Sequence, residues 1–186
     1  MTGEYVYLPS DDTFLLLKFL SNIGAADFSC EIGSGSGIVT ETLANISQRV
    51  LAVDISPKAC KVSWEKVRKR PNVDVICCDS LSAIREDKLF SLIVTNPPYL
   101  PFKDESRLWS GGEGGIEVAQ KFTFDALRRL KEGGRMAIVL SSLSNVKGYM
   151  NSLSERGVKV NTVIKEGVGL FEELYIIEIR MEKKYV

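Results

Sequence analysis

The residues best suited to chemistry follow a short apolar run and read Thr95-Asn96-Pro97-Pro98-Tyr99. The run itself, 89–94, is rich in β-branched residues and predicts a strand buried on both faces. Two consecutive prolines cannot continue a strand, because each lacks an N–H and fixes φ, so the strand has to stop at Asn96. The Asn96 side-chain oxygen and the Pro97 carbonyl then offer two acceptors, which together suit an –NH2 group. The alternative is an ordinary tight turn after a core strand.

A second candidate site is the glycine-rich stretch Gly33-Ser34-Gly35-Ser36-Gly37, which lies between a predicted strand (28–32) and a predicted helix (38–46). Glycine permits positive φ and lets a ligand approach the backbone, so this order is typical of nucleotide-binding βα units. The spacing is G-x-G-x-G, whereas dinucleotide sites use G-x-G-x-x-G. Glu31, two residues before the first glycine, would repel a pyrophosphate and attract a sulfonium or ammonium group. The stretch therefore favours S-adenosylmethionine over NAD.

Two further acids end predicted strands. Asp54 ends the strand 49–54 and comes 19 residues after Gly35, close to the roughly twenty expected of a ribose-binding acid. Its alternative role is to cap the helix that Pro57 opens. Asp79 ends the strand 72–79 and could receive an adenine amino group, with the Ser80 N–H against the ring. Its alternative role is to cap a short helix over 81–84.

The rest of the chain alternates between helical and extended patterns, which predicts an α/β fold with a mostly parallel seven-stranded sheet, an antiparallel terminal strand and helices on both faces. A first helix carries Phe14 to Leu20, and Thr13 is by itself an ordinary first-turn residue. Further helices are expected over 58–69, over 116–131 with a stop at Gly133-Gly134, and over 145–156; further strands are expected over 135–140, 158–164 and 174–180. The long loop 100–115, with Trp109, is interpreted as a flap on the substrate side.

Composition excludes several classes. Lys+Arg and Asp+Glu both number 24 in 186 residues, so no net basic charge is present to hold nucleic acid. No apolar run approaches a membrane span and no signal peptide is evident, which predicts a cytoplasmic protein and allows a nuclear pool. The chain has no His, which removes Ser-His and Cys-His nucleophile pairs. The cysteines lack C-x-x-C spacing, which predicts buried reduced thiols and no zinc site at positions Cys30, Cys60, Cys77 and Cys78.

The chain resembles the class I S-adenosylmethionine-dependent methyltransferases, and within them the HemK-type release-factor glutamine methyltransferases. The glycine-rich stretch is shared across a very large superfamily, whereas the Asn-Pro-Pro-Tyr box occurs mainly in enzymes that methylate planar amide or exocyclic amino nitrogens. The resemblance covers nearly the whole chain and implies one Rossmann-like methyltransferase domain over residues 1–186, with the segment 1–24 covering the cofactor. Four stretches carry it: Leu8-Pro9-Ser10-Asp11-Asp12-Thr13-Phe14-Leu15-Leu16-Leu17, Glu31-Ile32-Gly33-Ser34-Gly35-Ser36-Gly37, Ala52-Val53-Asp54-Ile55-Ser56-Pro57 and Asn96-Pro97-Pro98-Tyr99.

The same resemblance implies roles for individual residues. S-adenosylmethionine, which becomes S-adenosylhomocysteine, would be bound without a metal by Thr13, Glu31, Gly33, Gly35, Asp54, Asp79, Ser80 and Asn96. Catalysis would rest on Asn96, Pro97 and Tyr99, and these three together with Pro98 would bind the substrate. In this scheme Asn96 and Pro97 orient the nitrogen, and Tyr99 packs against its flat amide.

Substrate and partner are also implied by the resemblance. The predicted fold begins close to Met1, so the helical substrate-binding domain of the bacterial members is expected to be absent, as in the short eukaryotic and archaeal branch. The substrate of that branch is the glutamine of the Gly-Gly-Gln motif in a class I translation termination factor. Eukaryotic members work with a small zinc-binding activator protein, which is expected here to pair along strand 73–78 at an open sheet edge.

Three alternatives remain open at this stage. A nucleic-acid adenine N6-methyltransferase would use the same acceptor pair, but such enzymes usually add a basic track and a recognition domain. A protein lysine methyltransferase would need a base to remove a proton from the ammonium group. A nonenzymatic methyltransferase-fold scaffold or a dinucleotide-binding module would not need both motifs to be whole.

Overall fold

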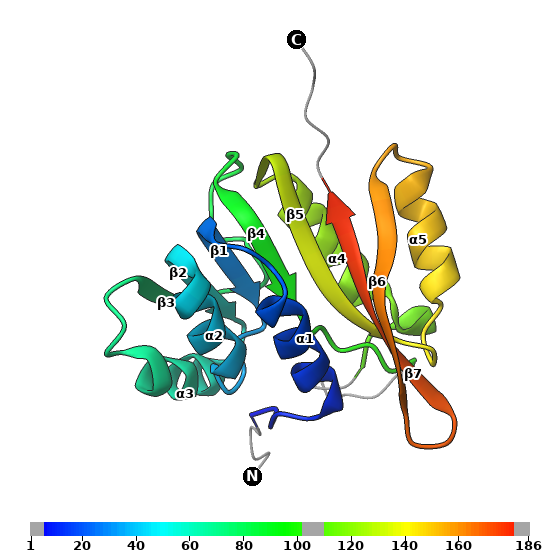
Figure 1. Cartoon of the computed structure of the whole chain (residues 1–186), viewed down its shortest axis with the longest axis horizontal. Coiled ribbons are helices and arrows are strands. Elements are labelled where there is room, and N and C mark those ends of the chain that lie inside the picture. Colours follow the sequence, from blue (N-terminus) through cyan, green and yellow to red (C-terminus); the bar gives the residue numbers. More distant parts are fainter. Residues whose placement is uncertain (1–5, 102–109, 181–186) are drawn as a thin grey trace.

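A computed structural model describes residues 6–101 and 110–180 of the chain. In this part of the chain, seven strands form one sheet in the order β3-β2-β1-β4-β5-β7-β6 (Figure 1). The strands are β1 (Ala26–Ile32), β2 (Ser47–Asp54), β3 (Val73–Cys77), β4 (Phe90–Thr95), β5 (Leu130–Ser141), β6 (Lys159–Val168) and β7 (Glu172–Arg180).

The sheet is parallel from β3 to β5, and β7 is antiparallel to both of its neighbours, β5 and β6. This arrangement confirms the predicted mostly parallel sheet with an antiparallel terminal strand. The last two strands form a hairpin because only a short turn separates them, and a short turn can join only antiparallel strands.

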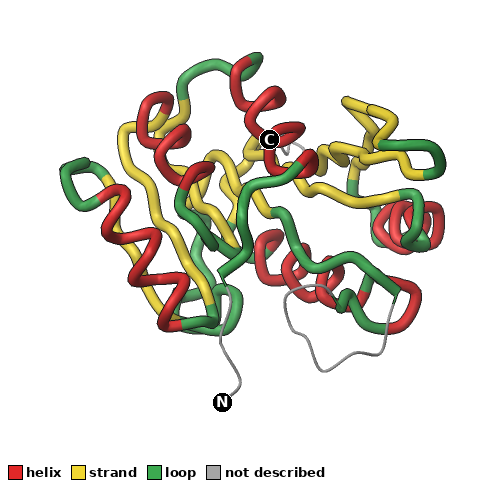
Figure 2. The backbone as a smooth tube through the Cα atoms, turned by 90° about the horizontal axis from the view of Figure 1, so that it is seen from below, coloured by secondary structure: helices red, strands yellow, loops and turns green. Residues whose placement is uncertain are grey.

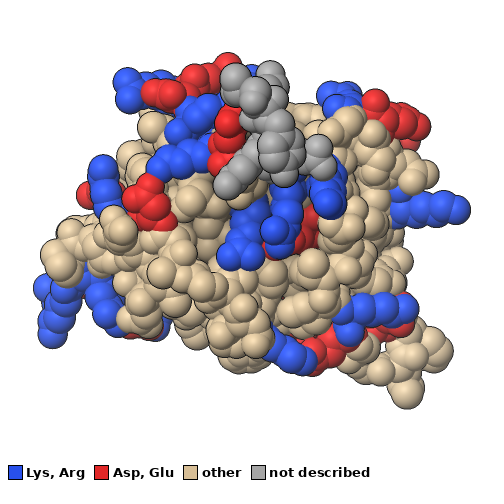
Figure 3. Space-filling view, turned by 45° about the horizontal axis from the view of Figure 1, so that its top comes forward, with Lys and Arg blue, Asp and Glu red and all other residues tan. Residues whose placement is uncertain are grey.

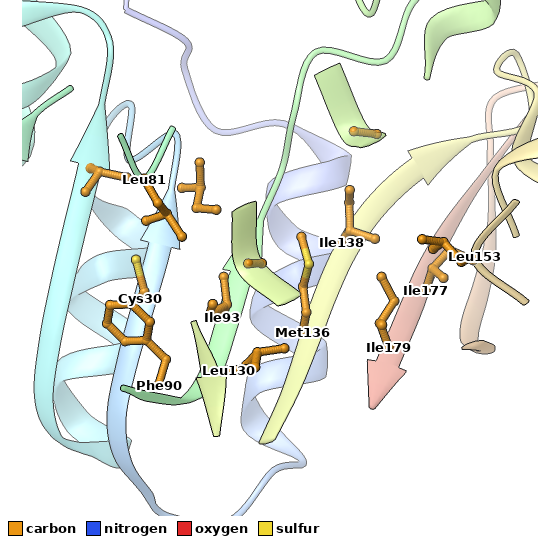
Figure 4. Close-up of a cluster of buried hydrophobic side chains, with 14 of the residues drawn as sticks. Cys30, Leu81, Phe90, Ile93, Leu130, Met136, Ile138, Leu153, Ile177 and Ile179 are labelled. Atoms are coloured by element: carbon orange, nitrogen blue, oxygen red, sulfur yellow. The ribbon is translucent and has the colours of Figure 1, made fainter. Parts of the chain in front are cut away.

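Helices cover both faces of the sheet, as the alternating pattern predicts (Figure 1). One apolar cluster joins the sheet to α1 (Asp11–Ser21), α2 (Ile38–Ile46) and α3 (Pro57–Val67). The other joins the opposite face to α4 (Glu117–Leu127) and α5 (Val146–Ser154). Figure 4 shows the second cluster, in which Phe90, Ile93, Met136 and Ile138 are fully buried on the central strands. A strand buried on two faces needs mostly apolar residues, and β4 carries four of them, Phe90, Leu92, Ile93 and Val94.

The cysteines only partly follow the prediction of buried thiols. All four are free, and Cys30 is completely buried in the cluster of Figure 4. Cys60 and Cys78 are half-buried, and Cys77 is exposed, so the prediction is wrong for Cys77. The reason is its position at the last residue of the edge strand β3, which has only one neighbouring strand.

Two predicted elements differ from the structure. The helix expected over 116–131 is shorter in the structure: α4 spans Glu117–Leu127, and the 3-10 turn η1 (Glu113–Gly115) precedes it. Leu130 instead begins β5, because it pairs with Phe90 and is fully buried. Gly133 and Gly134 thus lie in an irregularity of β5, where the register with β4 shifts, and they do not stop a helix. The short helix expected over 81–84 is a turn.

The carboxyl ends of the parallel strands meet at one edge of the sheet. Figure 2 views the molecule from that edge and shows the connecting loops gathered across its centre. Ligands of open α/β sheets bind at this edge, next to the strand where the order reverses. Here the order reverses at β1, which lies between β2 and β4.

The surface carries mixed charges. In Figure 3, lysine and arginine side chains are interspersed with aspartate and glutamate side chains. Several are ion-paired across elements, including Lys131 with Asp27 and Arg128 with Glu86. None of the described helices is both long enough and apolar enough to cross a bilayer.

Candidate active site

The ends of β1 and β4 are held side by side. Ile32 and Thr95 are register partners, and the buried Thr95 hydroxyl donates to the Ile32 carbonyl at 2.8 Å. The residues that follow them are Gly33 and Asn96. The two stretches that the sequence singles out therefore leave the sheet at neighbouring points.

The glycine-rich turn needs its glycines for two different reasons. Gly33, Gly35 and Gly37 all have positive φ, of 81°, 47° and 77°. A Cβ at Gly37 would also lie 2.9 Å from the Ser63 Cα, so this glycine lets the start of α2 pack against α3. A Cβ at Gly33 would meet nothing within 4 Å, so this part of the turn borders open space. That space is where a ligand can approach the backbone.

Asp54 connects the glycine-rich turn to the end of β2. Its Oδ2 accepts the Gly35 N–H and its Oδ1 accepts the Ser56 N–H, both at 2.9 Å. The cap of α3 is Ser56, whose side chain accepts the Ala59 N–H. The alternative role of Asp54 as that cap is therefore wrong. Each carboxylate oxygen holds one N–H and keeps acceptor capacity for a ligand.

A cavity of about 760 Å³ lies over this edge. It extends from α1 across the glycine-rich turn to the ends of β2, β3 and β4. This volume is in the range of small-molecule sites. Every site residue predicted from the sequence lines it, namely Thr13, Glu31, Gly33, Gly35, Asp54, Asp79, Ser80, Asn96, Pro97, Pro98 and Tyr99.

Several residues that line the cavity carry buried oxygens with no hydrogen-bond partner within the protein. Within the described ranges, four buried side-chain oxygens have no hydrogen-bond partner: those of Ser34, Ser63, Ser80 and Asn96. Three of the four, all except Ser63, line the cavity. Buried polar atoms are normally paired, so this grouping indicates a polar ligand. For Asn96 the atom is Oδ1, an acceptor, which calls for a ligand N–H or O–H.

The cavity is lined by acidic side chains and by no basic side chain of the described residues. Asp12, Glu31, Asp54 and Asp79 border it, and neither lysine nor arginine does so among the described residues. Phosphate groups would be repelled by such a lining. The cavity thus favours a cationic ligand over a pyrophosphate, as the position of Glu31 predicts.

Glu31 is buried at the end of β1, and its carboxylate accepts a hydrogen bond from the Thr40 hydroxyl in α2. Burial raises the pKa of Glu31 to about 8. The hydrogen bond from Thr40 lowers this pKa, and the nearby charge of Asp54 raises it. Without a ligand, Glu31 is therefore mostly protonated at neutral pH. A cationic group placed beside it would favour the ionised form.

Asp79 and Ser80 follow β3. Asp79 Oδ2 pairs with Lys121 of α4 at 2.5 Å, and both side chains are about half exposed. The capping role is wrong, since residues 81–84 form a turn and not a helix. Ser80 has a φ of 53°, a left-handed conformation that is unusual outside glycine. Its strained backbone and unpaired hydroxyl both lie at the cavity wall.

The sequence gives no sign of the role of Asp12, which appears above only within the stretch 8–17 that carries the family resemblance. The buried carboxylate of Asp12 accepts hydrogen bonds from the Tyr7 hydroxyl at 2.6 Å and the Tyr99 hydroxyl at 2.9 Å. It also accepts the N–H of Thr13. Burial and this carboxylate raise the pKa of both tyrosines. Asp12 thus ties the N-terminal segment and α1 to the Asn-Pro-Pro-Tyr box, and its side chain lines the cavity.

The predicted flap is described only at its two ends. Leu100 and Ser110 line the cavity and form a bridge with each other, and the Gly111 N–H donates to the Leu100 carbonyl at 2.9 Å. Gly115 packs so closely that a Cβ there would lie 2.2 Å from the Tyr99 carbonyl. Trp109 lies outside the described residues. The ends of the loop therefore meet at the mouth of the cavity.

The fold and the site together define a class I methyltransferase: a seven-stranded sheet of this order, with a glycine-rich turn after β1 and an Asn-Pro-Pro-Tyr box after β4. Comparison with known proteins shows the family. The family model of the methyltransferase small domain matches residues 11–167. The chain belongs to this family.

Curated relatives match over most of their length. A putative protein N5-glutamine methyltransferase of Methanocaldococcus jannaschii, MJ0928, is 33% identical over 92% of this chain and 90% of its own. Methyltransferase HEMK2 of Mus musculus is 31% identical over 88% of this chain and 85% of its own.

Among solved structures, the Mtq2–Trm112 complex of E. cuniculi, which methylates the termination factor eRF1, has a TM-score of 0.75 at 23% identity. The match covers 96% of this chain and 99% of the matched chain. At this identity the likeness concerns the fold.

Proposed function

We propose that this protein transfers a methyl group from S-adenosylmethionine to the side-chain nitrogen of the glutamine in the Gly-Gly-Gln motif of a class I translation termination factor. The observation that carries the proposal is the buried, unpaired Oδ1 of Asn96 at the wall of an acidic cavity. The relative from Methanocaldococcus jannaschii is named as a putative protein N5-glutamine methyltransferase, which agrees with a glutamine substrate. The mouse relative is named as the methyltransferase HEMK2, which agrees with methyl transfer.

The residues that line the cavity fit the cofactor. When bound, S-adenosylmethionine supplies an electrophilic methyl group on a positively charged sulfur. Glu31 would face its ammonium end, and the free acceptor capacity of Asp54 would bind the ribose hydroxyls. Asp79 and Ser80 would meet the adenine, and Ser80 brings an unpaired hydroxyl. The open space at Gly33 provides room for the methionine part, and Thr13 would cover it.

Asn96 and Pro97 would hold the substrate amide. An amide nitrogen is a poor nucleophile, because its lone pair is delocalised into the carbonyl. Two acceptors, Asn96 Oδ1 and the Pro97 carbonyl, would each take one N–H and aim the nitrogen at the methyl group. As the N–C bond forms and the C–S bond breaks, positive charge develops on nitrogen, and both oxygens stabilise it. The amide proton then leaves to water, in keeping with a chain that has no His.

The test is Asn96→Ala with labelled S-adenosylmethionine and a class I termination factor. Methyl transfer should fall by about 10²–10³-fold, the usual effect of removing one such polar contact. Affinity for the cofactor should stay within a few-fold, because its main contacts lie elsewhere. Asn151→Ala, at an exposed position in α5, is the matched control. A factor with the glutamine replaced by alanine, and DNA, serve as alternative substrates.

Two results would refute this assignment. One is an Asn96→Ala enzyme with normal turnover, which would remove the mechanism. The other is label that remains on the glutamine-to-alanine factor or moves to DNA, which would assign a different acceptor.

The proposal includes a small zinc-binding activator protein that pairs along β3. Among the described residues this strand lies at the edge of the sheet and pairs only with β2, as the prediction of an open edge over 73–78 requires. Val75 and Ile76 in β3 are apolar and only half-buried, and such an edge suits strand addition by a partner. The Mtq2–Trm112 complex is a two-protein assembly on the same fold. If the chain alone is soluble, binds cofactor tightly and is fully active, obligate pairing is wrong.

A further inference from the structure

The carboxylate of Asp12 is buried at the wall of the cavity, where no described lysine or arginine lies beside it. Its Oδ2 accepts hydrogen bonds from the Tyr7 hydroxyl at 2.6 Å and the Tyr99 hydroxyl at 2.9 Å. Its Oδ1 accepts the N–H of Thr13 at 2.6 Å and the Thr13 hydroxyl at 3.2 Å. Burying a carboxylate costs free energy, and buried ionisable groups rarely improve stability over apolar packing. The placement of Asp12 therefore indicates a role in the site that it lines.

Tyr99 is held at both of its ends. The Ser144 hydroxyl donates to the Tyr99 carbonyl at 2.6 Å, and Gly115 packs closely against the same carbonyl. At the far end of the ring, the hydroxyl donates to Asp12. Burial raises the pKa of the Tyr99 hydroxyl, and the Asp12 carboxylate raises it further, so the hydroxyl stays protonated and remains a donor. The orientation of the ring is thus set before a substrate binds.

The other hydroxyl on Asp12 belongs to a segment that crosses the glycine-rich turn. A Cβ at Gly35 would lie 3.7 Å from the carbonyl of Tyr7, so the backbone of Tyr7 passes close to this turn. Val6 and Tyr7 both line the cavity, and residues 6–10 belong to no helix or strand. The hydrogen bond to Asp12 therefore fastens an irregular segment next to the turn that would bind the cofactor.

A single oxygen, Asp12 Oδ2, thus connects the two sides of the cavity. Methyl transfer needs the sulfur, the methyl group and the substrate nitrogen in line, and a misplacement of about 1 Å can lower the rate about 100-fold. In the mechanism that the family resemblance implies, Tyr99 packs against the substrate amide, whereas Tyr7 lies on the cofactor side. Because both hydroxyls bind the same oxygen, the positions of the two side chains are set relative to each other.

We propose that Asp12 is a positioning residue for methyl transfer, which holds the Tyr99 ring against the substrate amide and holds Tyr7 beside the bound cofactor. This inference rests on the proposed function and adds a residue to its machinery. Asp12 forms and breaks no bond with the substrate in this role, and it acts through the two hydroxyls that it accepts.

The substrate side is tested by a double-mutant cycle of Asp12→Asn and Tyr99→Phe, with a termination factor, S-adenosylmethionine and the activator present. The kcat is expressed per cofactor-binding site, so that unfolded protein does not lower it. Each single variant should lose about tenfold or more in kcat, because a ring that is less firmly held misplaces the amide. The double variant should lose no more than the poorer single variant, because both changes remove the same hydrogen bond.

Asp11→Asn is the matched control for this cycle. Asp11 is an exposed acid in the same first turn of α1, so its replacement removes the same charge from the helix N-terminus without touching either tyrosine. The kcat of this variant should equal that of the wild type.

The cofactor side is tested without any substrate, by calorimetric titration with S-adenosylhomocysteine. Asp12→Asn and Tyr7→Phe should each raise its Kd about threefold to tenfold, the usual effect of losing one hydrogen bond. Tyr99→Phe should change this Kd by less than about twofold, because Tyr99 serves the substrate side.

The outcomes separate the two proposals. A wild-type enzyme that methylates the factor, combined with a double variant whose loss equals the product of the two single losses, overturns the positioning role and leaves the proposed function intact. A normal kcat in Asp12→Asn, or an equal loss in Asp11→Asn, overturns it as well. Unchanged cofactor affinity in both Asp12→Asn and Tyr7→Phe overturns the role of Asp12 on the cofactor side. A wild-type enzyme that does not methylate the factor overturns both proposals.

Discussion

The buried Glu31 leads to a prediction that can be measured without any substrate. Replacing it with glutamine keeps the size of the side chain and an acceptor for the Thr40 hydroxyl, and removes the ionisable group. The folded protein holds a proton on Glu31 up to about pH 8, whereas the ordinary pKa of the side chain is 4.5. Between these two values the folded state therefore binds one proton that the unfolded chain releases.

The sign of the effect follows from this difference. Stability falls as pH rises wherever the folded state binds more protons, by about 1.4 kcal/mol per pH unit for one proton. The loss of folding stability caused by Glu31 thus begins above pH 4.5 and reaches its full size above pH 8. Glu31→Gln lacks this cost, so the unliganded variant should exceed the wild type in stability by about 3 kcal/mol more at pH 7 than at pH 4.5.

The measurement is urea unfolding of both proteins at several pH values between 4.5 and 8.5. The difference in unfolding free energy between variant and wild type isolates Glu31 from the other carboxylates. Glu155→Gln, at an exposed position after α5, is the matched control. A difference that does not change with pH would show that Glu31 is ionised in the folded protein, and the reasoning from its burial would be wrong.

Glu31→Gln stabilises the unliganded protein but should weaken its binding of the cofactor. On the proposed function, the cofactor ammonium holds Glu31 ionised, so binding below pH 8 releases a proton. Wild-type affinity for S-adenosylmethionine should then weaken by up to about tenfold for each pH unit below 8. Glu31→Gln should bind more weakly and without this pH dependence. Calorimetric titration at two pH values measures both effects.

Two further substitutions test the frame of the site. Asp12→Asn removes the charge that accepts from both Tyr7 and Tyr99, so urea unfolding should show a loss of about 1–3 kcal/mol; an unchanged stability would mean that this carboxylate does not hold the two segments together. Gly37→Ala adds a clash with Ser63 to the strain of a positive φ, whereas Gly157→Ala, with a φ of 74° and open space around it, adds only the strain. The first should therefore cost clearly more than the second, for which about 1–2 kcal/mol is expected, and equal losses would contradict the close packing of α2 on α3.

The sequence was most informative where one residue type imposes a local constraint. The prolines after Asn96 forced the end of β4, and the glycines after β1 marked the turn that a ligand can approach. Both constraints act within a few residues and need no knowledge of the rest of the fold. For the same reason, all of the site residues at strand ends were brought to one cavity once the sheet order was known.

What the sequence did not indicate depends on contacts between distant segments. Asp12 accepts a hydrogen bond from Tyr99, which lies 87 residues further along the chain, and no residue near Asp12 in the sequence predicts that bond. Leu130 reads as the end of a helix until Phe90 is placed beside it in the sheet. Likewise, the 90% and 92% exposure of Leu170 and Phe171, between β6 and β7, could not be read from their types, since apolar residues near a strand are usually buried.

The reversed direction of β7 has a practical consequence for work with this protein. Because β7 runs against the parallel strands, Arg180 lies at the opposite rim of the sheet from the cavity, whereas Tyr7 lines the cavity itself. Fusion partners, fluorophores and immobilisation tags are therefore best attached on the C-terminal side of Arg180. The same attachments on the N-terminal side of Tyr7 would obstruct the cavity and alter the measured kinetics.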